Sequence, residues 1–181
     1  MSALHRRDVL RGLVVSLAAT VLGCGRSAQQ LAADRLRASG CEVRFKPVGQ
    51  SLDAFWLEAP HRALDADFET TLTQLPKLET VILAQTKLTN AQLARLPNLP
   101  RVTMLDLSDN DLTDACLPHL VRMSSLQTLI LDGNSLTDAA VPQLCELHGL
   151  RVLSVQRTSL SAESIVAVRT ALPRCLLTFE R

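Results

Sequence analysis

Residues 78–88 read LETVILAQTKL, and the same pattern returns every 24 residues as VTMLDLSDNDL (102–112), LQTLILDGNSL (126–136) and LRVLSVQRTSL (150–160). The first, fourth, sixth and eleventh positions of each copy are Leu or Val. The ninth position is polar in every copy and is occupied by Thr86, Asn110, Asn134 and Thr158. A fixed period in this range is typical of a solenoid, in which each repeat buries its apolar side chains against its neighbours.

The spacing L-x-x-L-x-L-x-x-(N/T)-x-L resembles the leucine-rich repeat family. The short period, with Thr-Asp-Ala at residues 113–115 and 137–139, is similar to bacterial repeats of the ribonuclease-inhibitor-like and cysteine-containing types. The resemblance covers roughly residues 50–180. It implies an α/β solenoid, with a parallel β-sheet on its concave face and short helices on its convex face. The polar ninth position then has a structural role, because an inward Asn can bond backbone groups that would otherwise be buried unpaired.

A cap is expected ahead of the repeats, at residues 30–53. Residues 30–39 are rich in helix formers and are followed by Gly40, which predicts a short helix. Residues 41–45 alternate and predict a strand, and residues 47–51 predict a turn. A solenoid needs such a cap, because its first repeat would otherwise expose a leucine face and a bare sheet edge.

The leucine-rich repeat domain is predicted to span residues 54–181 and to begin with a degenerate copy at residues 54–72. Its last edge strand is expected at residues 176–180. In each copy a strand is followed by a helix whose expected N-cap is Thr or Ser. These N-caps are Thr89, Thr113, Thr137 and Ser161.

The N-terminus resembles an export signal. Three arginines precede an apolar run at residues 12–22, which is short for a membrane span. Val21-Leu22-Gly23-Cys24 resembles the bacterial lipobox, which implies a signal peptide at residues 1–23, a lipidated Cys24 and a tether at residues 24–29. An ordinary signal peptide is the alternative.

Residues 5–11, HRRDVLR, also resemble a twin-arginine export signal, although Ser or Thr is missing before the pair and Val replaces Phe. Both general and twin-arginine export therefore stay open. Either route predicts an exported protein of the cell envelope, which the lipid on Cys24 would anchor to a membrane. The formal net charge of +1 argues against a nucleic-acid footprint.

Four cysteines remain beyond Cys24, and an even number in an exported chain invites disulfides. The 24-residue register places Cys145 opposite Val121, five residues beyond Cys116, which is outside bridging reach. Cys41 and Cys175 fall at opposite ends of the solenoid. We therefore expect these cysteines to be small buried apolar residues.

Outward side chains of the strands form the predicted concave face, where the leucine-rich repeat family usually binds its partners. They include an apolar stripe rimmed by carboxylates, which is a protein-binding signal. The alternative is that β-branched residues stand there for strand propensity alone. The predicted protein-binding residues are Trp56, Glu58, Thr80, Ile82, Met104, Asp106, Thr128, Ile130, Asp132, Val152 and Ser154.

Asp106, Asp109 and Asp132 fall on adjacent copies and suggest an alternative function as a metal site or an enzyme. Carboxylates in water at strand ends are the simpler interpretation. Acid–base catalysis needs paired groups in a pocket, and a gently curved sheet offers none. We therefore expect no cofactor and no catalytic site.

The sequence thus predicts a non-enzymatic, monomeric, membrane-anchored lipoprotein that recognises a protein partner with its concave face. The alternative is a structural component of the cell envelope that self-associates through its end strands or contacts the cell wall.

Overall fold

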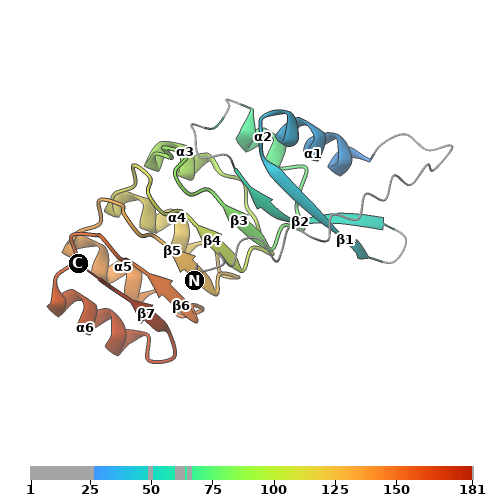
Figure 1. Ribbon diagram of the computed structural model, residues 1–181. Helices are drawn as coiled ribbons and strands as arrows, with labels where there is room; N and C mark the ends of the chain where they lie inside the picture. Colours follow the sequence, from blue (N-terminus) through green and yellow to red (C-terminus); the bar gives the residue numbers. More distant parts are fainter. Residues whose placement is uncertain (1–26, 49–50, 60–63, 65–66, 181) are drawn as a thin grey trace, which may run out of the picture.

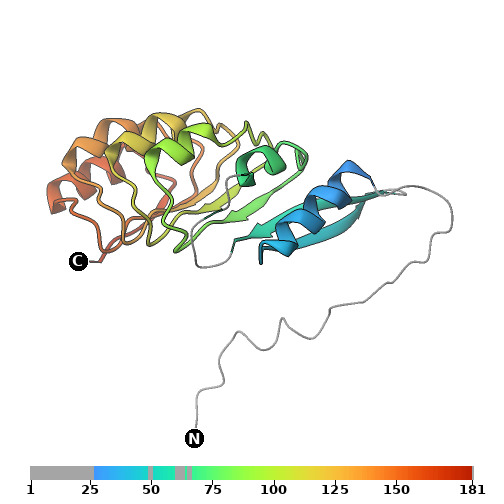
Figure 2. The ribbon, with the colours of Figure 1, turned by 90° about the horizontal axis from the view of Figure 1, so that it is seen from above.

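The computed structural model describes residues 27–48, 51–59, 64 and 67–180. The predicted signal peptide and Cys24 lie outside the described residues. One seven-stranded sheet runs through the described chain in the order β1-β2-β3-β4-β5-β6-β7, with helices α3 to α6 along one side (Figures 1 and 2).

The strands follow one another in chain order and are short beyond the first two. They are β1 (Glu42–Val48), β2 (Ser51–Glu58), β3 (Thr80–Ile82), β4 (Met104–Asp106), β5 (Thr128–Ile130), β6 (Val152–Ser154) and β7 (Leu176–Thr178). Strands β2 to β7 are parallel, and each residue pairs with the residue 24 positions later, as Val81 does with Leu105 and Leu105 with Leu129. The 24-residue period is therefore the register of the sheet.

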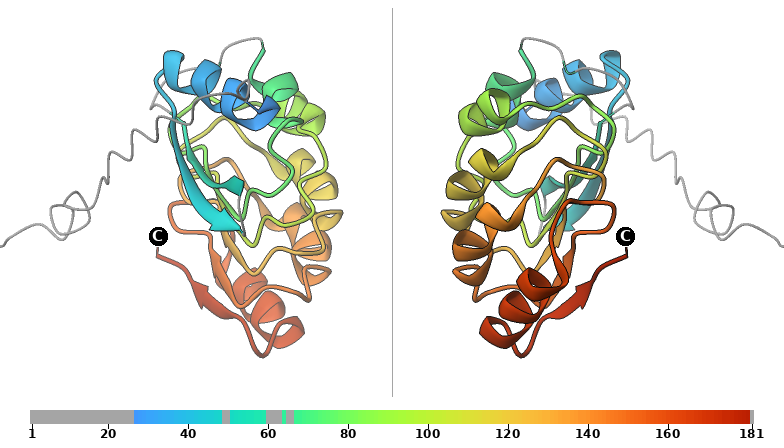
Figure 3. Two further views of the ribbon diagram at one scale, coloured as in Figure 1. Left: turned by 90° about the vertical axis from the view of Figure 1, so that its right-hand side faces the viewer. Right: turned by 90° about the vertical axis from the view of Figure 1, so that its left-hand side faces the viewer.

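The return segments lie on the convex side, where they stack side by side (Figure 3). The helices are α1 (Ala28–Ala38), α2 (Phe68–Leu72), α3 (Asn90–Arg95), α4 (Leu117–Val121), α5 (Val141–Cys145) and α6 (Ala162–Ala171). The 3-10 turns η1 (Asp114–Cys116) and η2 (Asp138–Ala140) precede α4 and α5. We call one strand with its return segment a coil. This arrangement is the expected α/β leucine-rich repeat solenoid.

The core is a continuous stack of leucines between the sheet and the helices. Leu105, Leu129 and Leu153 are each 0% exposed, as are Leu107 and Leu131 two residues further along. Burying a leucine contributes roughly 1.5–3 kcal/mol. Because every coil adds the same layer, stability accumulates along the solenoid through contacts between neighbouring coils.

Helix α1 begins earlier than the sequence indicates. It starts at Ala28, inside the expected tether, because Ser27 forms a capping box with Gln30. The Ser27 hydroxyl accepts from the Gln30 amide at 3.2 Å, and the Gln30 side chain accepts from the Ser27 amide at 3.0 Å. These bonds satisfy two amides that a helix start otherwise leaves unpaired.

The cap strand is also longer than expected, and the chain reverses between Val48 and Ser51, so the predicted turn at residues 47–51 is too wide at both ends. Pro47 and Val48 belong to β1, which pairs with β2 as an antiparallel hairpin. Proline is tolerated there because β1 is the edge strand and Pro47 lacks only an outward N–H. Strand β2 crosses the expected domain boundary at residue 53, so the cap and the first coil share a strand.

Short polar side chains begin the helices, in two ways. Thr89 and Ser161 accept from the amides three residues on, Gln92 at 3.3 Å and Ser164 at 3.2 Å. Thr113, also an expected N-cap, makes no such bond. A 3-10 turn follows it instead, and the helix starts later, with Pro118 in its first turn, where a missing N–H costs little.

A second set of polar bonds joins each coil to the next on the convex side. The Asn90 side chain accepts from the Thr113 amide at 3.1 Å. Asp114 Oδ1 accepts from the Thr137 amide at 2.8 Å, and in the following coil Asp138 Oδ1 accepts from the Ser161 amide at 2.7 Å. The helix starts are therefore tied together from coil to coil.

Cys116, Cys145 and Cys175 are thiols and form no disulfide with one another. Cys41 and Cys116 are buried, as expected, whereas Cys145 and Cys175 are only half-buried. Burial, together with the Asp114 carboxylate, raises the pKa of the Cys116 thiol to about 12. Cys116 is therefore inert at neutral pH, since the thiolate is the reactive form.

Candidate binding surface

The parallel register sorts the outward side chains of the concave face into two rows. One row runs across the sheet through Trp56, Thr80, Met104, Thr128 and Val152. The other runs through Glu58, Ile82, Asp106, Ile130 and Ser154. Because polar and apolar residues alternate in much of each row, the apolar side chains trace a zigzag from strand to strand.

The apolar stripe is less exposed than the sequence suggests. Ile82, Met104, Ile130 and Val152 are all half-buried. Neighbouring strands lie only about 4.8 Å apart, so diagonal side chains of this size shield one another from water. The concave face is thus a surface of closely spaced polar and apolar side chains and not a broad apolar patch.

Ser154 is one of the expected contact positions and is only 8% exposed. Its hydroxyl donates to Asp132 Oδ1 at 2.6 Å, and the same oxygen accepts from the Gln156 amide at 2.7 Å. Asp132 therefore binds the neighbouring coil and holds Ser154 against the sheet.

Trp56 stands on the same face, at the boundary with the cap. Its partner across the hairpin is Arg44, whose guanidinium carbon lies 3.9 Å from the centroid of the indole ring. Such a cation–π contact contributes about 0.5–2 kcal/mol. Trp56 is thus half-buried under the cap, and the stacked Arg44 limits the concave face at this end.

The three carboxylates of the alternative metal site each have a partner within the chain. Asp106 Oδ1 accepts from the amide and hydroxyl of Ser108 at 2.9 and 2.7 Å. Asp109 pairs with Arg157 at 2.9 Å, and Asp132 binds the next coil as described above. In the described part of the chain, no group of three His, Cys, Asp or Glu residues is placed to hold a metal ion.

The polar ninth positions lie beneath the concave face and hold the strand ends. The Asn110 amide nitrogen donates to the carbonyls of Leu83 at 2.7 Å and Leu107 at 2.9 Å. Its oxygen accepts from the amides of Thr86 at 3.0 Å and Leu88 at 2.8 Å.

The other members of this column make fewer bonds. Asn134 donates to the carbonyls of Leu107 at 2.9 Å and Leu131 at 3.0 Å. The hydroxyls of Thr86 and Thr158 each donate to the carbonyl three residues earlier. The column fixes the turn that follows each strand, and so fixes the concave face above it.

None of the helices in the described part of the chain is long and apolar enough to cross a membrane.

Comparison with known proteins gives structural similarities only. No protein-family model and no curated protein matches the sequence. Internalin C2 from Listeria monocytogenes is 21% identical, with a TM-score of 0.45, and the match covers 61% of this chain and 55% of that one. The leucine-rich repeat ectodomain of the receptor kinase SOBIR1 from Arabidopsis thaliana is 16% identical, with a TM-score of 0.49, over 85% of this chain and 91% of that one.

A second Listeria monocytogenes internalin, inlF, is 17% identical, with a TM-score of 0.45, over 62% of this chain and 37% of that one. The chain therefore spans about half the length of internalin C2 and less of inlF. At these identities and TM-scores the similarities assign no partner.

Proposed function

We propose that this chain is a non-enzymatic, exported lipoprotein that binds a protein partner through its concave face. The observation that supports this is the face itself. Half-buried Ile82, Met104 and Ile130 alternate with polar Thr80 and Thr128, and helices α3 to α6 all lie on the other side of the sheet (Figure 2). Apolar anchors among hydrogen-bonding groups are what a protein interface requires.

The mechanism is the presentation of a surface that is ordered before binding. Asn110 and Asn134 bond the ends of neighbouring strands, so the outward rows keep their spacing without a partner. Association then costs little ordering entropy. The face is small, so binding as a monomer is of modest affinity, and confinement to one membrane raises the effective concentration of the partner.

Membrane attachment is a separate part of the proposal, carried by the lipobox-like residues that end in Cys24. A lipid with two or more acyl chains on the new N-terminus would anchor the domain, since one chain alone gives only marginal, reversible binding. Replacing Cys24 with Ala should release the protein from the membrane fraction. Continued membrane attachment of the C24A protein would contradict the lipid anchor and leave the binding face untested by that result.

Photo-crosslinking in the native envelope tests the concave face. A photoreactive residue is introduced at Ile82 or at Ile130, and in matched proteins at Arg95 or Arg122 on the convex helices. We expect a shared crosslinked partner from the two strand positions and none from the helix positions. Crosslinks from the helix positions alone would rule out the concave face as the binding surface.

A structural role is the second candidate, because the two most exposed large apolar side chains of the described residues lie in the last coil. Leu176 on β7 is 64% exposed and Val166 on α6 is 61% exposed. Self-association through this coil would bury both side chains. Sedimentation of the purified protein distinguishes the two roles, since concentration-dependent assembly that L176D abolishes is expected only for the structural one.

A further inference from the structure

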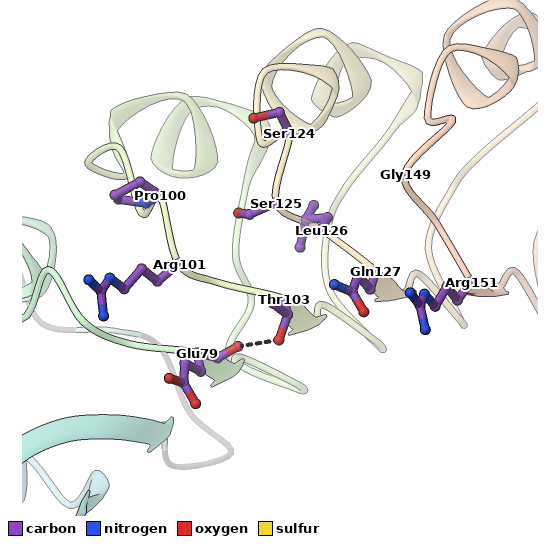
Figure 4. Close-up of a pocket in the computed structure, with 10 residues that line it drawn as sticks. All are labelled: Glu79, Pro100, Arg101, Thr103, Ser124, Ser125, Leu126, Gln127, Gly149 and Arg151. Carbon is purple, nitrogen blue, oxygen red and sulfur yellow. Dashed lines mark hydrogen bonds between the residues drawn. The ribbon is translucent and has the colours of Figure 1, made fainter. Parts of the chain in front are cut away.

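A shallow, open groove of about 570 Å³, with both polar and apolar lining, runs along one lateral side of the solenoid, between the convex helices and the starts of the strands (Figure 4). It spans several coils, from Glu79 and Arg101 at one end to Arg151 at the other. This lateral groove is separate from the concave face, because its residues precede the strands and are not on their outward rows.

The repeat itself produces the groove. Glu79, Thr103, Gln127 and Arg151 are spaced 24 residues apart and line it in four successive coils. The Thr103 hydroxyl donates to the Glu79 carbonyl at 3.3 Å and holds two of these coils together (Figure 4). This wall of the groove is therefore rigid, because the strands that follow these residues pair in the same 24-residue register.

A second column, two residues earlier, determines how open the groove is. Arg101 is followed in the next two coils by Ser125 and Gly149. The Ser125 hydroxyl donates to the Val102 carbonyl at 2.8 Å and so lies against the backbone. A Cβ on Gly149 would lie 3.1 Å from the Leu126 carbonyl oxygen. Gly149 therefore lets the neighbouring coil approach closely, and neither Ser125 nor Gly149 carries a long side chain between the two arginines.

The groove carries two uncompensated positive charges. Arg101 and Arg151 are exposed, and neither forms an ion pair with a carboxylate of the described residues. Glu79 is the carboxylate at this end, and its charge is offset by an ion pair with Lys46 from the cap. Arg151 points along the groove toward Gln127, and Arg101 lies at its far end with its side chain directed outward (Figure 4). Neither guanidinium group has an anion of the described residues as its partner.

We propose that the lateral groove binds an acidic peptide segment of a partner protein, with one carboxylate on Arg101 and a second on Arg151. The two arginines belong to coils two repeats apart, about 10 Å across the strands, and Arg101 lies two residues, up to about 7 Å, further from the strand than Arg151. Their backbones are therefore roughly 12 Å apart. An extended polyproline-type segment rises roughly 3.1 Å per residue and presents residues three apart on one side. Two acidic residues with two residues between them are about 9 Å apart, and the long arginine side chains cover the difference. Thr103 and Gln127 supply hydrogen-bonding groups between the anchors.

Fluorescence anisotropy with the purified full-length protein tests this site. The probe is a labelled peptide with the core Glu-Pro-Pro-Glu, and its controls have the cores Gln-Pro-Pro-Gln and Pro-Glu-Glu-Pro. We expect the first peptide to bind about tenfold more tightly than either control, with affinity that falls as salt is added. Equal binding of the Gln peptide would overturn the acidic ligand, and equal binding of the peptide with adjacent acids would overturn the two-anchor geometry.

Variants identify the site. R101Q/R151Q should lower the affinity of the Glu-Pro-Pro-Glu peptide about tenfold. The matched control is R122Q/R169Q, which removes the same charge from exposed positions on the convex helices. If both double variants lose the same affinity for this peptide, the loss comes from net charge alone, and the proposed site is overturned. These measurements do not test crosslinking from Ile82 and Ile130. The lateral groove and the concave face can therefore fail independently as binding sites.

Discussion

Asp109 and Arg157, two coils apart, form an ion pair of 2.9 Å that passes over the coil between them. Gly133 occupies the same position in that middle coil, with a φ of +65°. An ideal Cβ there would lie 2.1 Å from Asp109 Oδ1 and 3.3 Å from Arg157 Nη2. Asp109 and Arg157 themselves have φ values of 52° and 53°, so the turn after each strand is left-handed and only the middle coil needs glycine.

Replacing Gly133 with Ala should therefore destabilise the protein by about 1–3 kcal/mol, because the methyl group adds left-handed strain and displaces the Asp109 carboxylate. Urea unfolding followed by circular dichroism measures the change. D109A alone should cost less than about 1 kcal/mol, since the ion pair is largely exposed. The double variant G133A/D109A should lose less stability than the sum of the single variants. Strict additivity would show that the clash with Asp109 does not occur.

The asparagine ladder predicts a larger loss. N110A should destabilise the fold by several kcal/mol, because it leaves the buried amides of Thr86 and Leu88 without their acceptor, each worth about 1–3 kcal/mol. The carbonyls of Leu83 and Leu107 lose one donor but keep the Thr86 hydroxyl and the Asn134 amide. Equilibrium urea unfolding provides the measurement.

The control for this prediction is T158A in the same column. Thr158 is half-buried, and its hydroxyl makes a single bond, to the Val155 carbonyl at 2.8 Å. Its replacement should cost about 1 kcal/mol. If N110A and T158A are equally destabilising, the ladder does not hold the strand ends.

The sequence predicts the regular coils well, because each column repeats and therefore reports the same environment several times. Leu105, Leu129 and Leu153 lie one above another in the core, as their spacing requires. The cap has no second copy, so the sequence alone assigns Pro47 to a turn, although an edge strand accepts it. A segment that occurs only once cannot be aligned with other copies, so its strand positions cannot be read from a repeat.

The 24-residue spacing predicts which residues share an outward row of the sheet, but it does not predict how exposed each side chain is. Ser154 is buried because of Asp132, which belongs to the neighbouring coil, and no local pattern reveals a bond between side chains 22 residues apart. The coil-to-coil bonds of Asp114 and Asp138 were missed for a related reason. Both residues suit the first turn of their own helix, which concealed their contact with the next coil. Each of these bonds joins residues 23 positions apart, one fewer than the 24-residue period. A comparison of polar residues at that spacing would reveal them.

The junction of the cap with the repeats depends on a buried carboxylate. Asp53 in β2 has a side chain only 4% exposed, and Lys77 Nζ lies 2.7 Å from its Oδ2. K77A should destabilise the protein by about 3–5 kcal/mol, because it leaves this charge buried without its partner. Thermal unfolding monitored by circular dichroism checks the result.

The second ion pair of the junction, between Lys46 and Glu79, is the matched control. Both of its side chains are more than a third exposed, so K46A should cost less than about 1 kcal/mol. D53N/K77A should recover much of the stability lost in K77A, since it removes the unpaired charge. If K77A and K46A behave alike, Asp53 does not depend on Lys77.

The Asp138 carboxylate gives the solenoid an acid-sensitive bond between its last two helix starts. Hydrogen bonds from the Ser164 hydroxyl and from the amide and hydroxyl of Ser161 hold the pKa of Asp138 below its usual value. A carboxyl whose pKa is lowered by folding stabilises the native state above its unfolded pKa, and that contribution is lost as the pH falls through the folded pKa. The unfolding midpoint of the wild type should therefore fall as the pH drops below about 4.

In D138N this part of the acid dependence should be absent, because the amide oxygen still accepts but no longer titrates. Urea midpoints measured from pH 2 to pH 7 should then differ most between the two proteins near neutral pH and converge in acid. Asp111→Asn is the control, since Asp111 is an exposed carboxylate of the preceding coil whose side chain forms no hydrogen bond within the described residues. A D138N curve parallel to that of the wild type at every pH would show that Asp138 is not held by Ser161 and Ser164 in solution.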